Sequence, residues 1–165
     1  MRRLLILMAT SVTAALIASC GQDTGEQSSS RNIQAEPEHV TWKAFGDYVL
    51  HFNAISTDQL PPEVARAYNI VRSKNRALLT VSIIKNVDDV PGVVSQAGTV
   101  TATAANLTGQ LKNLTLREIR EDDAIYYIGD VAVANSETLV FNIEALPENT
   151  TDLMSVRFSR QFFAD

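Results

Sequence analysis

The residues best suited to catalysis or metal binding are few in this sequence of 165 residues. His39 and His51 are the only two histidines, and Cys20 is the only cysteine. A zinc site needs three or four ligands from histidine, cysteine or carboxylate side chains. Neither histidine lies in a motif that supplies such partners, and no serine stands in a Gly-x-Ser-x-Gly elbow. We therefore expect no metal ion, no cofactor and no catalytic residue in this chain.

Charged residues cluster at two places. Glu121-Asp122-Asp123 could recruit a divalent cation, but it lacks the alternating ligands and the glycine of a calcium loop. A solvated hairpin turn is the favoured interpretation.

Arg72, Lys74 and Arg76 form the second cluster. They lie two residues apart, so an extended chain would point all three side chains in one direction. Such a basic patch could bind a carboxylate, a phosphate or a lipopolysaccharide group. Ion pairs with acids of the same chain, Glu63, Asp58 or those at 121–123, are the favoured alternative.

The N-terminal segment points to export. Two arginines precede an apolar run over residues 4–17, which is shorter than the roughly 20 residues needed to span a bilayer. A positive start, a short apolar run and small residues are typical of a secretory signal peptide. Ile17-Ala18-Ser19-Cys20 resembles the bacterial lipobox, in which the cysteine carries a diacylglyceryl group. The sequence therefore predicts a signal peptide over residues 1–19 and lipidation at Cys20.

The net charge of the exported protein limits the classes of partner that it could bind. Loss of residues 1–19 leaves 12 basic and 19 acidic residues, a net charge of about −7. This balance argues against nucleic acid as a partner and against electrostatic binding to a membrane. The lipid on Cys20 would then provide membrane attachment, for which about two acyl chains are needed. Gly21 follows the cysteine, where an aspartate is commonly linked to inner-membrane retention, so we expect the periplasmic face of the outer membrane.

Composition divides the rest of the chain into a tether and a domain. Residues 20–37 are rich in Gly, Ser, Gln and acids, and they bury too little apolar surface to offset their ordering entropy. We interpret them as the lipidated cysteine and a disordered tether. Residues 38–165 are long enough to form one domain with a substantial core.

Within this domain the dominant hydrophobic period is two, which is typical of β-strands. Turn residues separate the alternating segments. The expected strands are residues 47–56, 76–85, 99–107, 113–120, 124–133, 138–145 and 154–162, and residues 40–42 could add an eighth. Short alternating strands at this spacing favour an all-β, two-sheet sandwich of immunoglobulin-like type with 7–8 strands. A closed barrel is the alternative.

One short helix interrupts the strand pattern, at about residues 61–68. Proline is favoured at a helix start, and Glu63 suits the positive N-terminal end of the helix. Asn69 can adopt the left-handed conformation that ends a helix. Val64, Ala67 and Tyr68 lie three to four residues apart, so we expect this face to pack on the sandwich with Tyr68 as its anchor.

Three runs resemble an uncharacterised bacterial family called domain of unknown function 4426. They are FGDYVLHFNA at residues 45–54, LPPEVARAYNIVRSKNRAL at 60–78 and LREIREDDAIYYIGD at 116–130. The resemblance covers essentially residues 38–165. It implies a proteobacterial envelope protein with a β-sandwich domain, and it implies no activity.

The leading functional hypothesis is a non-enzymatic binding or accessory module on the periplasmic side of a membrane. It would recognise an envelope protein or another envelope component through a sandwich face, a loop end or a sheet edge. The alternative is a small periplasmic enzyme with an unrecognised site. A deep pocket with convergent His, Asp or Arg side chains would favour the enzyme, and a shallow surface with a long unpaired strand would favour the module.

Overall fold

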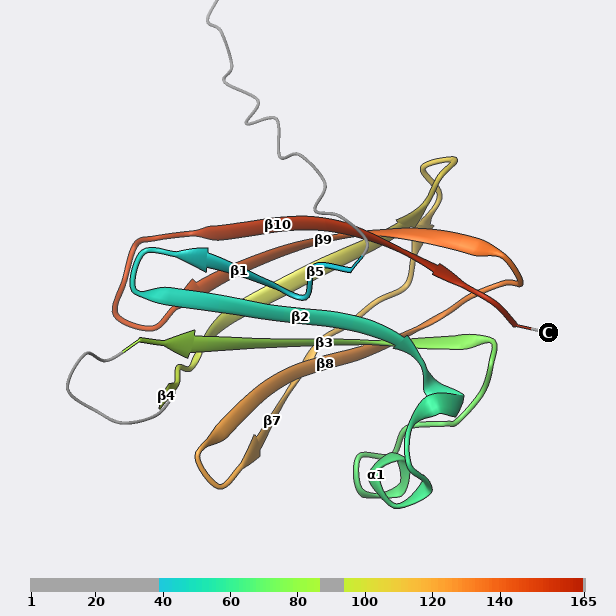
Figure 1. The fold of residues 1–165 in the computed structure, drawn as a ribbon, viewed down its shortest axis with the longest axis horizontal. Helices are drawn as coiled ribbons and strands as arrows, with labels where there is room; N and C mark the ends of the chain where they lie inside the picture. The colour runs from blue at the N-terminus through green and yellow to red at the C-terminus, as the bar shows by residue number, and fades with distance from the viewer. Residues whose placement is uncertain (1–38, 87–93, 165) are drawn as a thin grey trace, which may run out of the picture. The chain divides into compact units, whose positions relative to one another are not determined.

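Hydrophobic alternation produces two antiparallel sheets that face each other across one core (Figure 1). The structure is a computed structural model, and it describes residues 39–86 and 94–164. The predicted signal peptide, the lipidation site Cys20 and the predicted tether lie outside the described residues.

The first sheet has six strands in the order β1-β2-β3-β8-β7, with β4 paired to β3. The strands are β1 (Trp42–Phe45), β2 (Tyr48–Ser56), β3 (Arg76–Lys85), β4 (Val94–Ser95), β7 (Arg117–Glu121) and β8 (Ala124–Ala132). The second sheet has four strands in the order β10-β9-β5-β6. They are β5 (Gly98–Asn106), β6 (Leu111–Lys112), β9 (Glu137–Pro147) and β10 (Met154–Phe162).

The strand order confirms the immunoglobulin-like sandwich. Strands β2-β3-β8-β7 correspond to the A-B-E-D sheet of that fold, and β10-β9-β5 correspond to its G-F-C sheet. Strand β1 extends the first sheet by pairing with β2, so the additional N-terminal strand forms, at Trp42–Phe45 rather than at residues 40–42. The short strands β4 and β6 were not predicted, and the described residues form ten strands rather than 7–8.

The core lies between the inner faces of the two sheets. On β2, Leu50, Phe52 and Ala54 are buried, as their alternation with exposed residues predicts. Phe158 of β10 lies with its ring centroid 4.9 Å from that of Phe52 in the opposite sheet and 5.0 Å from that of Phe141 on β9. These three rings join the two sheets at the centre of the sandwich.

One strand prediction is wrong at residues 113–116. There the chain has no regular structure, because it passes from β6 in one sheet to β7 in the other. Leu114 and Leu116 pack against the core without belonging to a strand. The passage crosses Gly129 of β8 so closely that an added Cβ would lie 2.5 Å from the carbonyl oxygen of Thr115. A glycine is therefore required at this crossing.

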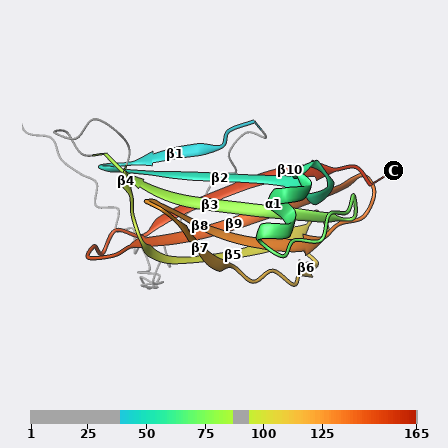
Figure 2. The same ribbon diagram turned by 90° about the horizontal axis from the view of Figure 1, so that it is seen from below.

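The predicted helix forms as α1 (Pro62–Ala67), after a short 3₁₀ turn at Thr57–Gln59. Asn69 follows with φ of 53°, the left-handed exit that the sequence predicts. Figure 2 shows α1 in front of β3 and β8, on the outer side of the six-stranded sheet. Among the described residues, no helix is long and apolar enough to cross a membrane.

A buried tyrosine ties the two sheets together at their edge. Tyr127 of β8 is 5% exposed, and its hydroxyl accepts a hydrogen bond from the Gly98 N–H of β5 at 2.9 Å. The hydroxyl can donate its hydrogen bond to the Gly98 carbonyl oxygen at 2.9 Å or to the Glu118 carboxylate at 3.2 Å. Burial is the main cause that raises the pKa of Tyr127.

Replacement of Tyr127 by Phe should lower the free energy of unfolding by about 1–3 kcal/mol, because two main-chain groups of Gly98 lose this partner. Folding raises the pKa of Tyr127, so the protonated hydroxyl adds to the free energy of unfolding. This contribution is complete below about pH 10, the pKa of an unfolded tyrosine, and it is lost as the pH rises through the pKa of Tyr127 in the folded protein. Urea denaturation from pH 8 to 11 measures both effects. Tyr126→Phe, on the exposed face of the same strand, is the control and should change stability by under about 0.5 kcal/mol. Equal losses in the two variants would contradict the role of Tyr127.

Candidate functional site

The structure does not place the three predicted basic residues on one extended segment. Only Arg76 lies in a strand, at the start of β3, and Lys74 lies in a turn. The expectation that the three residues lie on one extended chain is therefore wrong, because residues 70–75 form the return from α1 to β3 and include a turn at Lys74.

The contacts of Arg76 and Arg72 lie within the chain. Arg76 forms an ion pair with Asp130 on β8, with its Nε 2.6 Å from Oδ2. Arg72 donates a hydrogen bond from Nη2 to the main-chain oxygen of Asp58 at 2.7 Å. The favoured alternative of intramolecular pairing thus holds for Arg76, with a partner that the sequence did not indicate. A binding role for Arg72 and Lys74 stays a prediction.

The Arg76–Asp130 pair should contribute little to stability. Its side chains are 40% and 36% exposed, so water and salt screen their attraction. A double-mutant cycle with Arg76→Ala and Asp130→Ala should give a coupling energy of about 0.5 kcal/mol that falls in 1 M NaCl. A coupling above about 2 kcal/mol, or one that salt leaves unchanged, would contradict this expectation.

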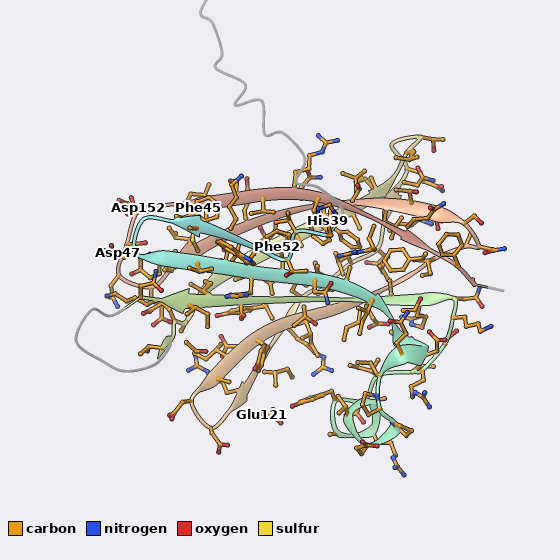
Figure 3. All side chains as sticks on the ribbon, viewed as in Figure 1. His39, Phe45, Asp47, Phe52, Glu121 and Asp152 are labelled. Carbon is orange, nitrogen blue, oxygen red and sulfur yellow. The ribbon has the colours of Figure 1, made fainter. Side chains whose placement is uncertain are left out.

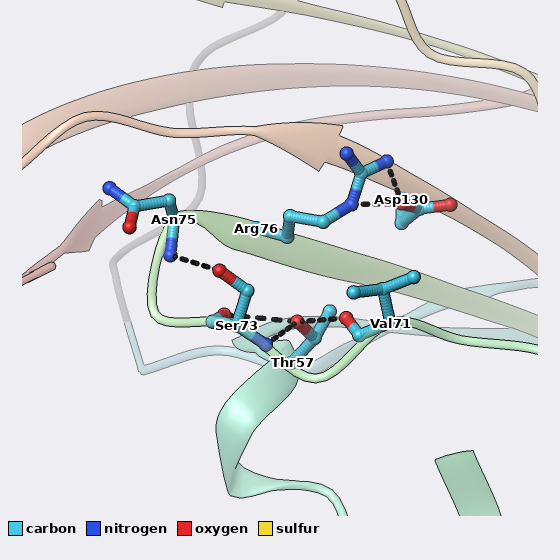
Figure 4. A network of polar contacts seen from close by, with 6 residues as sticks. All are labelled: Thr57, Val71, Ser73, Asn75, Arg76 and Asp130. Atoms are coloured by element: carbon cyan, nitrogen blue, oxygen red, sulfur yellow. Dashed lines mark hydrogen bonds and ion pairs between the residues drawn. The ribbon is translucent and has the colours of Figure 1, made fainter. Parts of the chain in front are cut away.

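Thr57 fixes the segment that connects α1 to β3 (Figure 4). Its side chain is fully buried. The hydroxyl accepts a hydrogen bond from the Ser73 N–H at 2.9 Å, and it can donate to the carbonyl of Val71 at 2.8 Å or of Ser73 at 3.0 Å. Asn75 then donates its N–H to the Ser73 hydroxyl at 3.1 Å. One buried side chain therefore anchors the return path of the chain.

This arrangement holds α1 against the outer face of the six-stranded sheet. A second apolar cluster forms there, outside the main core, with Leu60, Ala65, Leu78 and Ile128 buried. Tyr68 and Val64 pack against it, as the sequence predicts, but the prediction is wrong for Ala67, which is exposed, while Ala65 is buried. Helix α1 covers only part of this face, and it leaves a hollow between itself and the β7–β8 hairpin.

We call this space the α1 hollow, and its volume is about 570 Å³. That volume is within the range of small-molecule pockets, about 300–1,000 Å³. Most of its walls are apolar or aromatic. It is lined by Leu60, Glu63, Val64, Ala67, Tyr68, Ile70, Leu78, Thr80, Ile119, Glu121, Tyr126 and Ile128.

Polar contacts bridge the hollow between the helix segment and strand β7. Tyr68 and Glu121 both line the hollow, and interaction with the Glu121 carboxylate is the main cause that raises the pKa of Tyr68. Figure 3 shows Glu121 between the β7–β8 hairpin and α1. Arg117, at the other end of β7, donates a hydrogen bond to the main-chain oxygen of Tyr68. Tyr68 is therefore tied to both ends of β7.

A second hollow of about 520 Å³ adjoins the first on the same face of the sheet. The two share Thr80 and Tyr126 in their walls. His51 lines the second hollow and is exposed, which agrees with its predicted place on the polar face of β2. Across residues 39–86 and 94–164, no group of three or more His, Cys, Asp or Glu side chains could hold a metal ion. Glu121-Asp122-Asp123 ends β7 and begins the turn to β8, as predicted.

Sequence reasoning identified only one wall of this site. It marked the segment from Pro61 to Tyr68 as the place where the strand pattern breaks. The opposite wall is formed by Ile119 and Glu121 of β7. Nothing in the sequence next to these two residues indicates a site, because their position beside α1 depends on the strand order. The sequence feature that could have indicated this wall is Ile119 itself, because it is an apolar residue between Glu118 and Arg120 in a strand of otherwise charged residues.

Comparison with known proteins gives the following matches. The family described as a domain of unknown function, DUF4426, matches residues 42–165. The crystal structure of a DUF4426 family protein from Pseudomonas aeruginosa PAO1 is similar, with 30% sequence identity and a TM-score of 0.62. The similarity covers 75% of this chain and 94% of that chain. No curated protein matches this chain significantly.

Proposed function

This chain belongs to the DUF4426 family, and from that premise and the α1 hollow we propose that it is a non-enzymatic binding module of the bacterial envelope. The observation that carries the proposal is the composition of the hollow. Among the described residues, the carboxylates that line it are Glu63 and Glu121, and no His, Asp or Arg side chain does so. Apolar walls with a few polar groups are typical of sites that bind by burying apolar surface.

The shape of the site also supports binding. The hollow lies on the outer face of the sheet and is open to solvent along the side of Ala67, Glu63 and Tyr126, which are exposed. A ligand can therefore enter without unfolding α1. A further accessible feature is β10, a nine-residue strand at the edge of the four-stranded sheet, where strand addition can occur.

We further propose that the module is lipid-anchored through Cys20 on the periplasmic face of the outer membrane. The signal sequence, the lipobox-like motif and Gly21 support this part of the proposal. Protein labelled in cells with a palmitate analogue should carry the label, and Cys20→Ala should lose it. Sucrose-gradient fractionation should place the labelled protein with the outer membrane. Absence of label on the wild-type protein would refute the anchor.

Binding in the hollow can be tested with a neutral apolar dye, N-phenyl-1-naphthylamine. The protein is residues 20–165 carrying Cys20→Ala, which needs no detergent. Ala67→Trp places a large side chain in the mouth of the hollow, and Ala44→Trp makes the same change at an exposed position of β1 outside it. The first substitution should weaken dye binding about tenfold or more, and the second should leave it unchanged.

Melting curves of both variants show whether the substitutions perturb the fold. Dye binding that is equal in all three proteins would place the binding site elsewhere and overturn the role of the hollow. Recovery of a chemically altered ligand after incubation with native protein would favour the rival function, a small periplasmic enzyme.

A further inference from the structure

Among the described residues, the charged side chains that line the α1 hollow are both acidic. Glu63 on α1 and Glu121 on β7 are exposed and line the hollow. No lysine or arginine is among the lining residues. Two arginines near this segment hydrogen-bond to its main chain: Arg66 donates to the carbonyl of Pro62, and Arg117 donates to the carbonyl of Tyr68. Within residues 39–86 and 94–164, the walls of the hollow therefore present two carboxylates and no cationic side chain to a ligand.

Two aromatic rings lie beside these carboxylates. Tyr68 and Tyr126 both line the hollow, and Tyr126 is 37% exposed. Tyr68, Tyr126 and Glu121 line the same hollow, and the Glu121 carboxylate is the main cause that raises the pKa of Tyr68. Aromatic faces attract ammonium groups, and tyrosine-lined sites with carboxylates are a common way to bind quaternary ammonium ligands.

The floor of the hollow is apolar, unlike its acidic and aromatic mouth. Leu78 and Ile128 from the sheet are buried beneath it, and Ile70 and Ile119 border it. These side chains offer no hydrogen bond, so they suit the hydrocarbon part of a ligand. The hollow is thus amphipathic, with an apolar floor and an acidic, aromatic mouth.

We propose that the α1 hollow binds an amphiphile that has a short alkyl chain and a cationic ammonium head. The inference rests on the proposed binding function and names the ligand class for that same site. The alkyl chain lies on the floor formed by Leu78 and Ile128, and the ammonium group lies between the two carboxylates and the two tyrosine rings. The volume of the hollow, about 570 Å³, lies within the range of about 300–1,000 Å³ that is typical of small-molecule pockets, so an eight-carbon amphiphile suits its size.

The charge of the head group can be varied while the chain stays constant. Octyltrimethylammonium, 1-octanol and octanoate carry a positive, a neutral and a negative head on the same eight-carbon chain. Calorimetric titration or dye displacement with the unlipidated chain, residues 20–165 with Cys20→Ala, gives their affinities. We expect octyltrimethylammonium to bind about tenfold or more tightly than 1-octanol, and octanoate to bind more weakly than 1-octanol.

Charge-neutral variants test which residues select the head group. Glu63→Gln with Glu121→Gln should reduce the preference for the ammonium over 1-octanol to within about twofold. Glutamine can still accept a hydrogen bond from Tyr68, so 1-octanol should bind as before. Glu144→Gln, an exposed carboxylate on β9 in the other sheet, is the matched control and should retain the full preference.

The outcomes separate the ligand class from the binding function. Equal binding of the three octyl compounds, or tighter binding of octanoate, would overturn the cationic ligand while the apolar binding site survives. Binding of none of them, together with dye binding that Ala67→Trp leaves unchanged, would overturn both. Retention of the ammonium preference in the double variant would show that other groups select the charge, and it would also overturn the inference.

Discussion

Replacement of Phe158 by alanine should destabilise the domain more than any other change considered, by about 3–5 kcal/mol. The side chain is fully buried, and it contacts Phe52 of the opposite sheet and Phe141 of its own. Its removal leaves a cavity between the sheets and also removes two aromatic contacts, each worth about 0.5–1.5 kcal/mol beyond the area that it buries. We expect the midpoint of thermal unfolding to fall by roughly 10–20 °C.

Two further substitutions make this expectation testable even if the alanine variant fails to fold. Phe158→Leu keeps most of the side-chain volume and should lose a smaller share of the stability. Phe163→Ala, at a position that is 62% exposed, is the matched control and should change stability by under about 0.5 kcal/mol. If Phe158→Ala and Phe163→Ala were equally stable, the three rings would not form the centre of the core.

The strands could be predicted because their burial repeats every second residue. In β2 the inward Leu50, Phe52 and Ala54 alternate with exposed His51 and Asn53, and this pattern needs no knowledge of neighbours. The same reasoning failed at residues 113–116. Leu114 and Leu116 alternate like strand residues, but their burial comes from a crossing over Gly129, more than ten residues later in the chain.

Only the helical half of the candidate site could be predicted from local sequence. Pro62, Glu63 and Asn69 carry signals that act within one helical turn, so the limits of α1 were close to those observed. Ile119 and Glu121 reach the site only because β7 pairs with β8, which in turn pairs with β3. That order depends on the whole sandwich, and no residue of β7 reveals it alone.

The basic residues show a third limit of local reasoning. Even spacing of Arg72, Lys74 and Arg76 predicts a common direction only if the backbone is extended. The backbone at residues 70–75 instead follows the hydrogen bonds of Thr57, which lies about fifteen residues earlier in the chain. Serine and threonine are plentiful in this sequence, and nothing next to Thr57 marks it as the residue that organises the return of the chain.

Thr57 should therefore be the most sensitive polar position outside the main core. Thr57→Val keeps the shape of the side chain and removes the hydroxyl, so the Ser73 N–H and the Val71 carbonyl lose a buried partner. Each unsatisfied buried group costs about 1–3 kcal/mol, and we expect a loss of about 2–4 kcal/mol in unfolding free energy. Thr57→Ser keeps the hydroxyl and loses one methyl group, so it should lose only about 1 kcal/mol.

The effect of Thr57→Val should also be local, because the hydroxyl holds the segment that seats α1 on the sheet. Amide hydrogen exchange should accelerate at Ser73 and over residues 70–75, while the amides of β9 at the centre of the other sheet keep the protection that the remaining global stability allows. Thr57→Ser should retain protection at Ser73. If the Ser73 amide stays protected in Thr57→Val, or if valine and serine cost the same, the hydroxyl does not anchor this segment. Loosening of α1 should also weaken dye binding in the hollow, since Leu60, Val64 and Tyr68 form one of its walls.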